Sequence, residues 1–304
     1  MPHAVQVLCL SLFAVLIHLV AMAQPLPPLK CVTFNLLHGG VFSGLRGNAQ
    51  NLDRRLDLVV EELRTLGADV IGVQEASWSR GRGNVAERLA ARLGFHHVYA
   101  PAGFRLFPSE LLNGMVATVM NLTEGPAIIS RFPIASWQAY DLPRCGRFTD
   151  PRVLLCTELR TPSGPLQACS THTSGNLCQH KSVVNIIRER RGPLPVLLMG
   201  DFNAPEHSPA ITALTQEAGF VDTFRSVNPG APGLTVWQNV EVSRSTVFRR
   251  VDYVFLVPGT ETTGQVLSSR VILDTPRQFP GGQMVWPSDH YGVLTEVEVF
   301  SPTG

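Results

Sequence analysis

The chain has 304 residues, of which 44% are hydrophobic, and its formal net charge is +1. This length and apolar content allow a single large α/β domain with a sizeable core. A charge so close to zero neither requires nor excludes a nucleic-acid partner, because local patches matter more than the total. The cysteines show no C-x-x-C pairing, which argues against a zinc site of that spacing.

The N-terminal segment has the features of an export signal. Residues 1–23 contain no Lys, Arg, Asp or Glu, are mostly apolar from residue 5 to residue 20, and end in an A-x-A motif at Ala23. This pattern predicts a signal peptide over residues 1–23, a short linker over 24–29, and a secreted or periplasmic protein. An uncleaved membrane anchor is the alternative, although the apolar run is shorter than the ~20 residues of a typical span.

Cleavage after residue 23 leaves five cysteines, which an exported protein can oxidise. Cys145 and Cys156 flank a turn sequence, so they could face each other across a hairpin. Cys169 and Cys178 bracket a loop, and bridges at both pairs would leave Cys31 as a buried free thiol. Five small reduced core residues are the alternative, because spacing alone does not settle connectivity.

The first third of the chain alternates strands with helices. Strands are predicted over residues 30–35, 70–74 and 96–100. Apolar residues on one face predict a helix over 51–66, which Asn51 can cap and Gly67 can end. A second helix is predicted after the cap residue Asn84, with Glu87 three residues on and Gly94 as its stop.

The middle of the chain has β-rich runs separated by turn residues, a pattern typical of antiparallel hairpins. These predicted strands cover residues 115–120, 127–130, 135–140, 153–159 and 166–171. A helix over about 179–191, an apolar strand over 196–199 and a helix starting at Ser208-Pro209 restore the alternation.

The C-terminal part predicts strands over residues 247–257, 266–273 and 291–300. The segments 106–112 and 276–287 are predicted as loops. Parallel units beside hairpins do not fit a purely parallel sheet. They fit a four-layer α/β-sandwich over residues 30–300, with two mixed β-sheets packed face to face and helices outside.

Polar residues follow the most apolar strand of the chain. Val196–Met199 leads directly into Gly200, Asp201, Phe202 and Asn203. Residues two apart on an extended chain point the same way, so Asp201 and Asn203 are predicted to face one spot. An ordinary Asx turn after the strand is the alternative.

Two further strands end in the same way, with Asn35 after the first and Glu75 after the second. A charge at the end of a buried strand is costly unless it is paired or metal-bound. A turn cap is the alternative for Asn35, and an arginine partner is the alternative for Glu75.

Acids and histidines supply the remaining candidates. Asp289 and His290 are adjacent before a predicted strand, so the acid can face a metal and the imidazole a water molecule. Asp252 lies inside an apolar strand, and we pair it with His290 as the acid that orients the imidazole. His172 closes another β-rich run, with a hydrogen-bonded core histidine as the alternative.

With these motifs in this order, the chain resembles the endonuclease/exonuclease/phosphatase superfamily, and within it the deoxyribonuclease and sphingomyelinase branches. The similarity covers residues 30–300, and the segment 124–134 looks like the central strand motif of the family. The resemblance implies the same four-layer α/β-sandwich. Leu36 and Leu37 stand where abasic-site enzymes usually carry a polar or acidic residue, which argues against abasic-site repair.

The resemblance also implies a metal site in which Glu75 is the principal ligand, with Asn35 and Asp289 beside it. Oxygen-only ligands favour Mg²⁺, with Mn²⁺ or Ca²⁺ as alternatives, over zinc.

The implied catalytic residues surround this metal site. The resemblance places Asp201 and Asn203 at the attacking water and the phosphate, and His290 as base or phosphate contact supported by Asp252. His172 would stabilise the reacting phosphate or the leaving oxygen.

We therefore expect a metal-dependent phosphoric-ester hydrolase, in first place a nuclease-like phosphodiesterase that uses in-line attack of water. A sphingomyelinase-like lipid phosphodiesterase and a phosphomonoesterase are the alternatives, so the substrate partner is a nucleic acid, a phospholipid head group or a small phosphate ester. Candidate lipid contacts are the aromatic residues Phe104, Phe107, Phe279 and Trp286. We expect a monomer with no obligate protein partner. The complete set of site residues argues against a non-enzymatic binding module.

Overall fold

The computed structural model describes residues 28–37, 51–79, 83–103, 107, 109, 111–113, 115–116, 123–145, 151–162 and 164–299. The predicted signal peptide and most of the predicted linker lie outside these residues, as does Phe104. Leu29, predicted as the last linker residue, is instead the first residue of strand β1. In the described part of the chain, no helix has both the length and the apolar character needed to cross a bilayer.

Sheet A has seven strands in the described residues, in the order β12-β15-β1-β2-β5-β4, with β3 paired to β2. The strands are β1 (Leu29–Asn35), β2 (Val70–Ser79), β3 (Gly83–Asn84), β4 (His96–Tyr99), β5 (Thr123–Ser130), β12 (Gly264–Ile272) and β15 (Gly292–Val299). The β1–β2 pair is parallel and the other pairs are antiparallel, so the sheet is mixed.

Sheet B has six strands in the described residues, in the order β10-β11-β9-β8-β7-β6. They are β6 (Ile134–Asp141), β7 (Val153–Thr161), β8 (Gly164–His172), β9 (Val196–Asp201), β10 (Val221–Asp222) and β11 (Asp252–Val257). Only the β8–β9 pair among them is parallel, which makes this sheet mixed as well.

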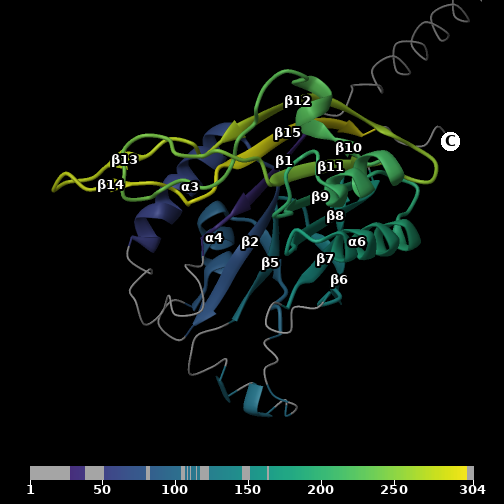
Figure 1. Cartoon of the computed structure of the whole chain (residues 1–304), viewed down its shortest axis with the longest axis horizontal. Coiled ribbons are helices and arrows are strands. Elements are labelled where there is room, and N and C mark those ends of the chain that lie inside the picture. Colours follow the sequence, from purple (N-terminus) through teal and green to yellow (C-terminus); the bar gives the residue numbers. More distant parts are fainter. Residues whose placement is uncertain are drawn as a thin grey trace, which may run out of the picture.

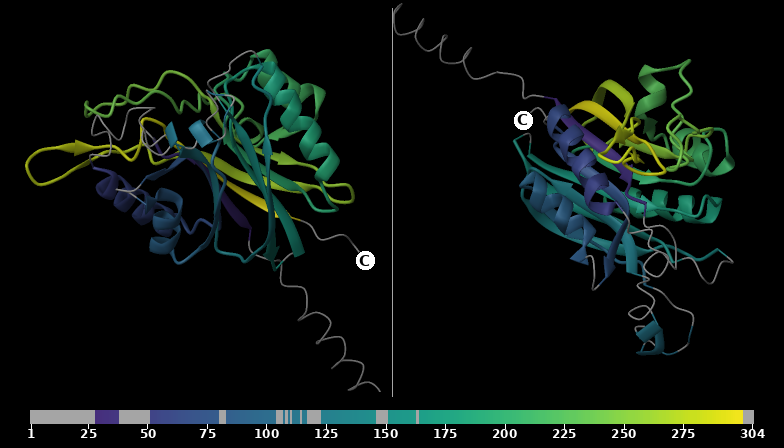
Figure 2. Two further views of the ribbon diagram at one scale, coloured as in Figure 1. Left: turned by 90° about the horizontal axis from the view of Figure 1, so that it is seen from below. Right: turned by 90° about the vertical axis from the view of Figure 1, so that its left-hand side faces the viewer.

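The two sheets pack face to face, and helices cover their outer faces (Figures 1 and 2). The helices α3 (Leu52–Leu66) and α4 (Val85–Leu93) pack on sheet A. The helices α6 (Leu177–Arg190) and α7 (Pro209–Thr212) pack on sheet B, and α7 continues as a π-helical turn, Ala213–Glu217. The short helix α8 (Thr223–Val227) lies between β10 and β11 in the chain. This four-layer α/β-sandwich confirms the predicted fold class.

Apolar side chains from both sheets fill the space between them. The central cluster includes Val70 and Ile128 of sheet A, and Leu155, Leu197 and Met199 of sheet B. Gly72 faces Met199 so closely that an added Cβ would lie 2.8 Å from the Met199 Cβ. Close packing of the sheets matters for function because it brings strand ends from both sheets to one place.

The helix ends agree with the sequence at three of four predicted positions. Gly67 and Gly94 end α3 and α4 in the left-handed conformation, where glycine has no Cβ penalty. The Asn84 side chain accepts hydrogen bonds from Ala86 and Glu87 N–H groups at 3.0 and 3.2 Å, which confirms its capping role. The predicted Asn51 cap was wrong, because Asn51 has φ 65° and its side chain accepts no capping hydrogen bond.

Several predicted segments differ from the observed ones. The strand predicted over 247–257 begins only at Asp252, and Arg249 forms an isolated bridge with Val236. Residues 115 and 116 are helical, and the rest of the strand predicted over 115–120 lies outside the described residues. The segment predicted as a loop over 276–287 contains a small hairpin of β13 (Arg277–Gln278) and β14 (Met284–Val285).

The described residues contain two disulfides, and neither is one of the pairings that the sequence suggested as possible. Cys156 pairs with Cys169, which lies directly opposite it on the antiparallel β7–β8 pair. Cys145 pairs with Cys178 at the start of α6. Cys31 is free and buried as predicted, and burial raises the pKa of its thiol to about 12.

Candidate active site

Three neighbouring strands of sheet B place polar side chains side by side. In the strand register, Asp201 of β9 lies opposite His172 of β8 on one side and opposite Asp252 of β11 on the other. All three side chains are buried. Burying two carboxylates and an imidazole together is costly unless they are paired, so each of these groups needs a partner at this end of the sheet.

Asn35 joins this group to sheet A. Its Nδ2 donates to Glu75 Oε1 at 3.0 Å and to Asp201 Oδ2 at 3.1 Å. Its Oδ1 accepts a hydrogen bond from the Leu37 N–H group at 3.0 Å. Asn35 therefore holds two carboxylates from different sheets at a fixed separation, and its predicted role as a metal ligand stays a prediction.

Glu75 reaches the site because β2 contains a bulge. The β2–β5 register shifts between Val73 and Ala76, so Gln74 and Glu75 together lie opposite Pro126. Glu75 has φ 54°, an uncommon conformation for a residue with a side chain. A bulge redirects a side chain locally. Glu75 was predicted to end its strand, whereas β2 continues past it to Ser79.

Asp201 and Asn203 meet at one spot, but through a turn and not through an extended strand. Asn203 has φ 49°, and its N–H group donates to Asp201 Oδ1 at 2.9 Å. This is the Asx turn that was the alternative interpretation of the sequence. The turn directs the Asn203 amide toward His172, with 2.9 Å between Asn203 Nδ2 and His172 Nε2.

His172 is neutral in this arrangement. Asn203 Nδ2 also donates to the Thr173 carbonyl at 3.0 Å, which fixes the amide orientation, so His172 Nε2 accepts. Burial, together with the positive charges of Arg152 and His290, lowers the pKa of His172 well below its usual value. His172 Nε2 also lies 3.4 Å from Asp201 Oδ2.

The predicted pairing of Asp252 with His290 agrees with the geometry, since His290 Nδ1 lies 3.0 Å from Asp252 Oδ2. Its Nε2 lies 3.8 Å from Asp201 Oδ2. Burial alone would lower the pKa of His290, but the carboxylates of Asp252 and Asp201 outweigh it and raise that pKa to about 10. Burial and the Asp252 charge raise the pKa of Asp201 to about 7. Of the two predicted roles of His290, phosphate contact therefore fits a protonated ring.

Asp289 lies beside the same ring and near Glu75. Its Oδ1 accepts a hydrogen bond from Ser288 Oγ at 3.2 Å. Burial raises the pKa of Asp289, the positive charge of His290 opposes this shift, and the negative charge of Glu75 adds to it. Glu75 and Asp289 are near enough for their charges to interact, and their carboxylate oxygens are hard donors of the kind that Mg²⁺, Mn²⁺ or Ca²⁺ prefers.

A second group has metal-like spacing. Ligand atoms of Asp201, Asp252 and His290 lie within 4.8 Å of one another. Within this group the Nδ1 atom of His290 already bonds to Asp252, and the predicted metal ligands Glu75 and Asp289 lie outside the group.

Aromatic residues of the core pack against Phe202 and so stabilise the Asp201–Asn203 turn. The Phe202 ring packs edge-on against Tyr253 and Phe255, with ring centroids 5.8 and 5.2 Å apart, and against His180 at 5.4 Å. The Tyr253 hydroxyl donates to the Ala204 carbonyl at 2.9 Å. The backbone on both sides of Asn203 is thereby tied to the core.

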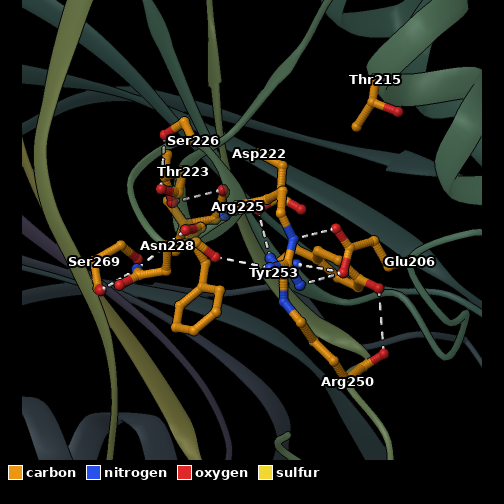
Figure 3. Close-up of polar contacts among 12 residues, drawn as sticks. Glu206, Thr215, Asp222, Thr223, Arg225, Ser226, Asn228, Arg250, Tyr253 and Ser269 are labelled. Atoms are coloured by element: carbon orange, nitrogen blue, oxygen red, sulfur yellow. Dashed lines mark hydrogen bonds and ion pairs between the residues drawn. The ribbon is translucent and has the colours of Figure 1, made fainter. Parts of the chain in front are cut away.

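A network of two arginines and two acids supports Tyr253 (Figure 3). The Arg250 guanidinium stacks 4.4 Å from the Tyr253 ring centroid and pairs with Asp222 at 2.5 Å. Glu206 lies 3.4 Å from Arg250 and accepts two hydrogen bonds from Arg225 at 2.5 and 2.7 Å. The sequence analysis missed this support, because its members are ordinary charged residues that only the fold brings together.

His180, which packs against Phe202, makes the stability of this region sensitive to acid. Its Nδ1 donates to the Asn176 carbonyl at 2.8 Å, and its buried Nε2 has no hydrogen-bond partner among the described residues. Burial lowers the pKa of His180 to about 4, against the opposing effect of the Asn176 carbonyl. The unfolded chain, with an ordinary pKa of about 6.5, takes up a proton first as the pH falls. The stability contributed by neutral, buried His180 is therefore fully present above about pH 6.5. It decreases progressively as the pH falls from about 6.5 to about 4.

We expect the wild-type protein to lose about 2 kcal/mol more unfolding free energy than His180→Leu between about pH 7 and about pH 4.5. Urea denaturation at both pH values measures this difference. The variant His96→Gln, which changes an exposed histidine, should follow the wild type. Equal acid sensitivity of wild type and His180→Leu would contradict the assignment.

Three of the four predicted lipid contacts, Trp286, Phe107 and Phe279, lie in the described residues. Trp286 is buried, stacks on Tyr291 with ring centroids 5.8 Å apart and donates to the Val242 carbonyl, so its prediction as an exposed lipid contact was wrong. Phe107 is exposed, and Phe279 is half-buried beneath the Arg54 guanidinium.

A four-layer sandwich with acids, amides and histidines converging from both sheets defines a class of hydrolytic phosphoesterases. The chain matches the model of the endonuclease/exonuclease/phosphatase family over residues 32–290 and belongs to that family. The predicted family is thereby confirmed, and the narrower deoxyribonuclease and sphingomyelinase branch stays a prediction.

Solved structures show the same fold. A mannosyl-6-phosphatase of Bacteroides thetaiotaomicron matches with a TM-score of 0.67 and 18% identity, over 88% of this chain and 99% of that one. The catalytic domain of human nocturnin, solved with a sulfate anion, matches with a TM-score of 0.60 and 19% identity, over 90% and 94% of the two chains. The D. rerio protein TDP2, solved with a single-stranded DNA product, matches with a TM-score of 0.59 and 16% identity, over 89% and 98%. A comparison with curated proteins gave no significant match.

Proposed function

We propose that this protein is an exported, divalent-metal-dependent phosphodiesterase that cleaves its substrate by direct attack of water. The observation that carries the proposal is the meeting of both sheets at Asp201. One Asp201 oxygen lies 3.1 Å from Asn35 Nδ2, 3.4 Å from His172 Nε2 and 3.8 Å from His290 Nε2. Donors, acceptors and two imidazoles thus surround a point where a water molecule and a phosphate oxygen can sit.

We assign a different role in this reaction to each residue of the site. Asp201, with a pKa raised to about 7, is suited to accept the proton of the attacking water near neutral pH. His290, protonated and held by Asp252, donates from Nε2 to a phosphate oxygen. His172 and Asn203 lie on the other side of Asp201, where they can orient the water or contact the phosphate. No covalent intermediate is required.

The metal assignment rests on donor chemistry. Glu75 and Asp289 would hold a divalent cation, with Mg²⁺ as the first choice, beside the phosphate. When bound, the ion supplies positive charge against the phosphate and leaving-group oxygens.

Export is supported by the cysteines as well as by the N-terminal sequence. The disulfides Cys145–Cys178 and Cys156–Cys169 are expected to persist in an oxidising compartment, such as the periplasm or the extracellular space. The observed bridges therefore favour a secreted or periplasmic location.

Phosphomonoester hydrolysis is the second candidate. One solved structure of the same fold is named as a mannosyl-6-phosphatase, and it aligns over nearly its whole length. The catalytic residues described above serve either reaction, because both require water to attack a phosphorus atom.

A substrate panel separates these candidates. Purified mature protein with Mg²⁺ is assayed on single-stranded and plasmid DNA, sphingomyelin vesicles and a sugar 6-phosphate. We expect cleavage of phosphodiester bonds to exceed release of inorganic phosphate from the monoester by at least about tenfold. Preferred turnover of the sugar phosphate would overturn the diesterase proposal in favour of the second candidate.

A further inference from the structure

Two aromatic side chains are exposed beside the candidate active site. Trp237 is 55% exposed and Phe248 is 63% exposed, and their ring centroids lie 6.4 Å apart at an interplanar angle of 64°. Exposing two large rings to water next to each other costs hydrophobic free energy, which makes the pair a candidate binding surface. We call Trp237, Phe248 and the neighbouring Arg249 the aromatic platform.

The platform is attached directly to the catalytic segment. Val236 forms bridges with both Arg249 and His290. The Gln238 N–H group donates to the Asp289 carbonyl at 2.7 Å. Trp237 therefore lies between two residues, Val236 and Gln238, whose backbones pair with the segment of Asp289 and His290.

The platform also has a rigid base. Gln238 Oε1 accepts hydrogen bonds from the Thr246 N–H group at 3.0 Å and the Tyr291 hydroxyl at 2.8 Å. Gln238 Nε2 donates to the carbonyls of Asn239 and Arg244 at 2.7 and 3.1 Å. A side chain buried in this way fixes the loop that carries both rings, so the platform is arranged before a ligand arrives.

The charge of the platform selects among ligands. The Arg249 guanidinium lies 5.9 Å from the centroid of each ring, and its buried Nε has no hydrogen-bond partner among the described residues. Aromatic faces attract quaternary ammonium groups, but a fixed cation at the same rings repels them. A choline head group is therefore disfavoured. A planar base followed by an anionic phosphate is complementary to two rings and one arginine.

We propose that the aromatic platform binds a nucleobase of the substrate, by stacking on Trp237 or Phe248, while Arg249 contacts a neighbouring phosphate. This inference rests on the proposed phosphodiesterase function and narrows it to single-stranded or locally unpaired nucleic acid. Stacking on an aromatic side chain accepts every base, so the platform would give little sequence preference.

Two matched probes test the platform by binding alone. One is a fluorescein-labelled oligothymidylate, and the other is an oligomer of equal length in which every unit is a base-free tetrahydrofuran phosphate. Fluorescence anisotropy in EDTA at low salt measures affinity without cleavage. We expect the wild type to bind the base-containing probe about tenfold more tightly, and Trp237→Ala or Phe248→Ala to reduce this ratio toward about one.

The matched control is Trp137→Ala. Trp137 is also 55% exposed, but it lies on β6 at the far edge of sheet B. This variant should keep the wild-type ratio, and thermal unfolding of all three variants confirms that they are folded. A ratio near one in the wild type, or an unchanged ratio in both platform variants, overturns the proposal.

Turnover assays separate this inference from the proposed function. If the protein cleaves both probes and binds them with equal affinity, the platform proposal is overturned and the phosphodiesterase function is retained. Base-dependent binding without hydrolysis of any phosphoester overturns the phosphodiesterase function and leaves the platform supported. Preferred hydrolysis of sphingomyelin vesicles, impaired by Trp237→Ala, overturns the nucleobase assignment in favour of a lipid.

Discussion

Glu75→Gln is expected to reduce phosphodiester hydrolysis by about 1,000-fold or more, and EDTA should abolish the wild-type activity reversibly. The substitution keeps the size of the side chain and an oxygen that can accept from Asn35, which lies 3.0 Å away in the wild type. It removes only the charge that, together with Asp289, forms the proposed cation site. Initial rates across a Mg²⁺ titration measure the loss.

Thermal unfolding gives a second readout that does not depend on turnover. A cation that binds only the folded state adds about 2.7 kcal/mol at 100 times its dissociation constant. We expect this Mg²⁺-dependent gain in the wild type and not in Glu75→Gln. Without metal, Glu75→Gln should be at least as stable as the wild type, since the repulsion with Asp289 is relieved.

The control is Glu158→Gln, which changes an exposed glutamate on β7. It should retain both the activity and the Mg²⁺-dependent stabilisation. Wild-type activity that survives chelation, or equal stabilisation of Glu75→Gln by Mg²⁺, would show that these carboxylates hold no catalytic cation.

The sequence was sufficient to predict which strand ends come together. Apolar runs that end in a polar residue identified Asn35 and Asp201, because a buried strand must end where the sheet meets solvent. The need of a buried acid for a partner correctly paired Asp252 with His290. Strand ends of both sheets meet because the two sheets pack closely, and this packing follows from the fold class.

The local geometry of the site was not predictable in the same way. The bulge at Glu75 and the left-handed Asn203 leave no mark in hydrophobic periodicity, since both depend on one backbone torsion at a single residue. Disulfide connectivity could not be predicted for a related reason. Cys156 and Cys169 are joined because of strand register, which the sequence does not specify.

The sequence does not reveal residues whose proposed role depends on whether the fold exposes or buries them. No sequence motif marks Trp237 or Phe248, and only their exposure beside His290 suggests substrate binding. Trp286, which was predicted as an exposed contact, is instead buried. Its ring donates a hydrogen bond to the Val242 carbonyl, in the loop between Trp237 and Phe248. Composition does not distinguish an exposed from a buried tryptophan in a loop, because both are flanked by polar and turn-forming residues.

Asp252→Asn is expected to lower kcat by about 100- to 10,000-fold and to change KM little. Asp252 is fully buried, and its Oδ2 lies 3.0 Å from His290 Nδ1. An asparagine at this position removes the negative charge that keeps His290 protonated, and its amide group can turn the ring into the wrong tautomer. The substrate would still bind, but the ring would no longer donate to the phosphate. Steady-state kinetics on a phosphodiester measure both constants.

Coupling between the two residues distinguishes this role from a purely structural one. If Asp252 acts through His290, then Asp252→Asn should cost little in a protein that already carries His290→Ala, because the group that it orients is absent. Asp69→Asn changes a buried acid at the opposite end of β2, where Asp69 pairs with Arg131 at 3.1 Å, and should preserve kcat per folded molecule. Additive losses in the double variant would mean that Asp252 supports the fold or binds an ion by itself, and His290 would then need a different explanation for its raised pKa.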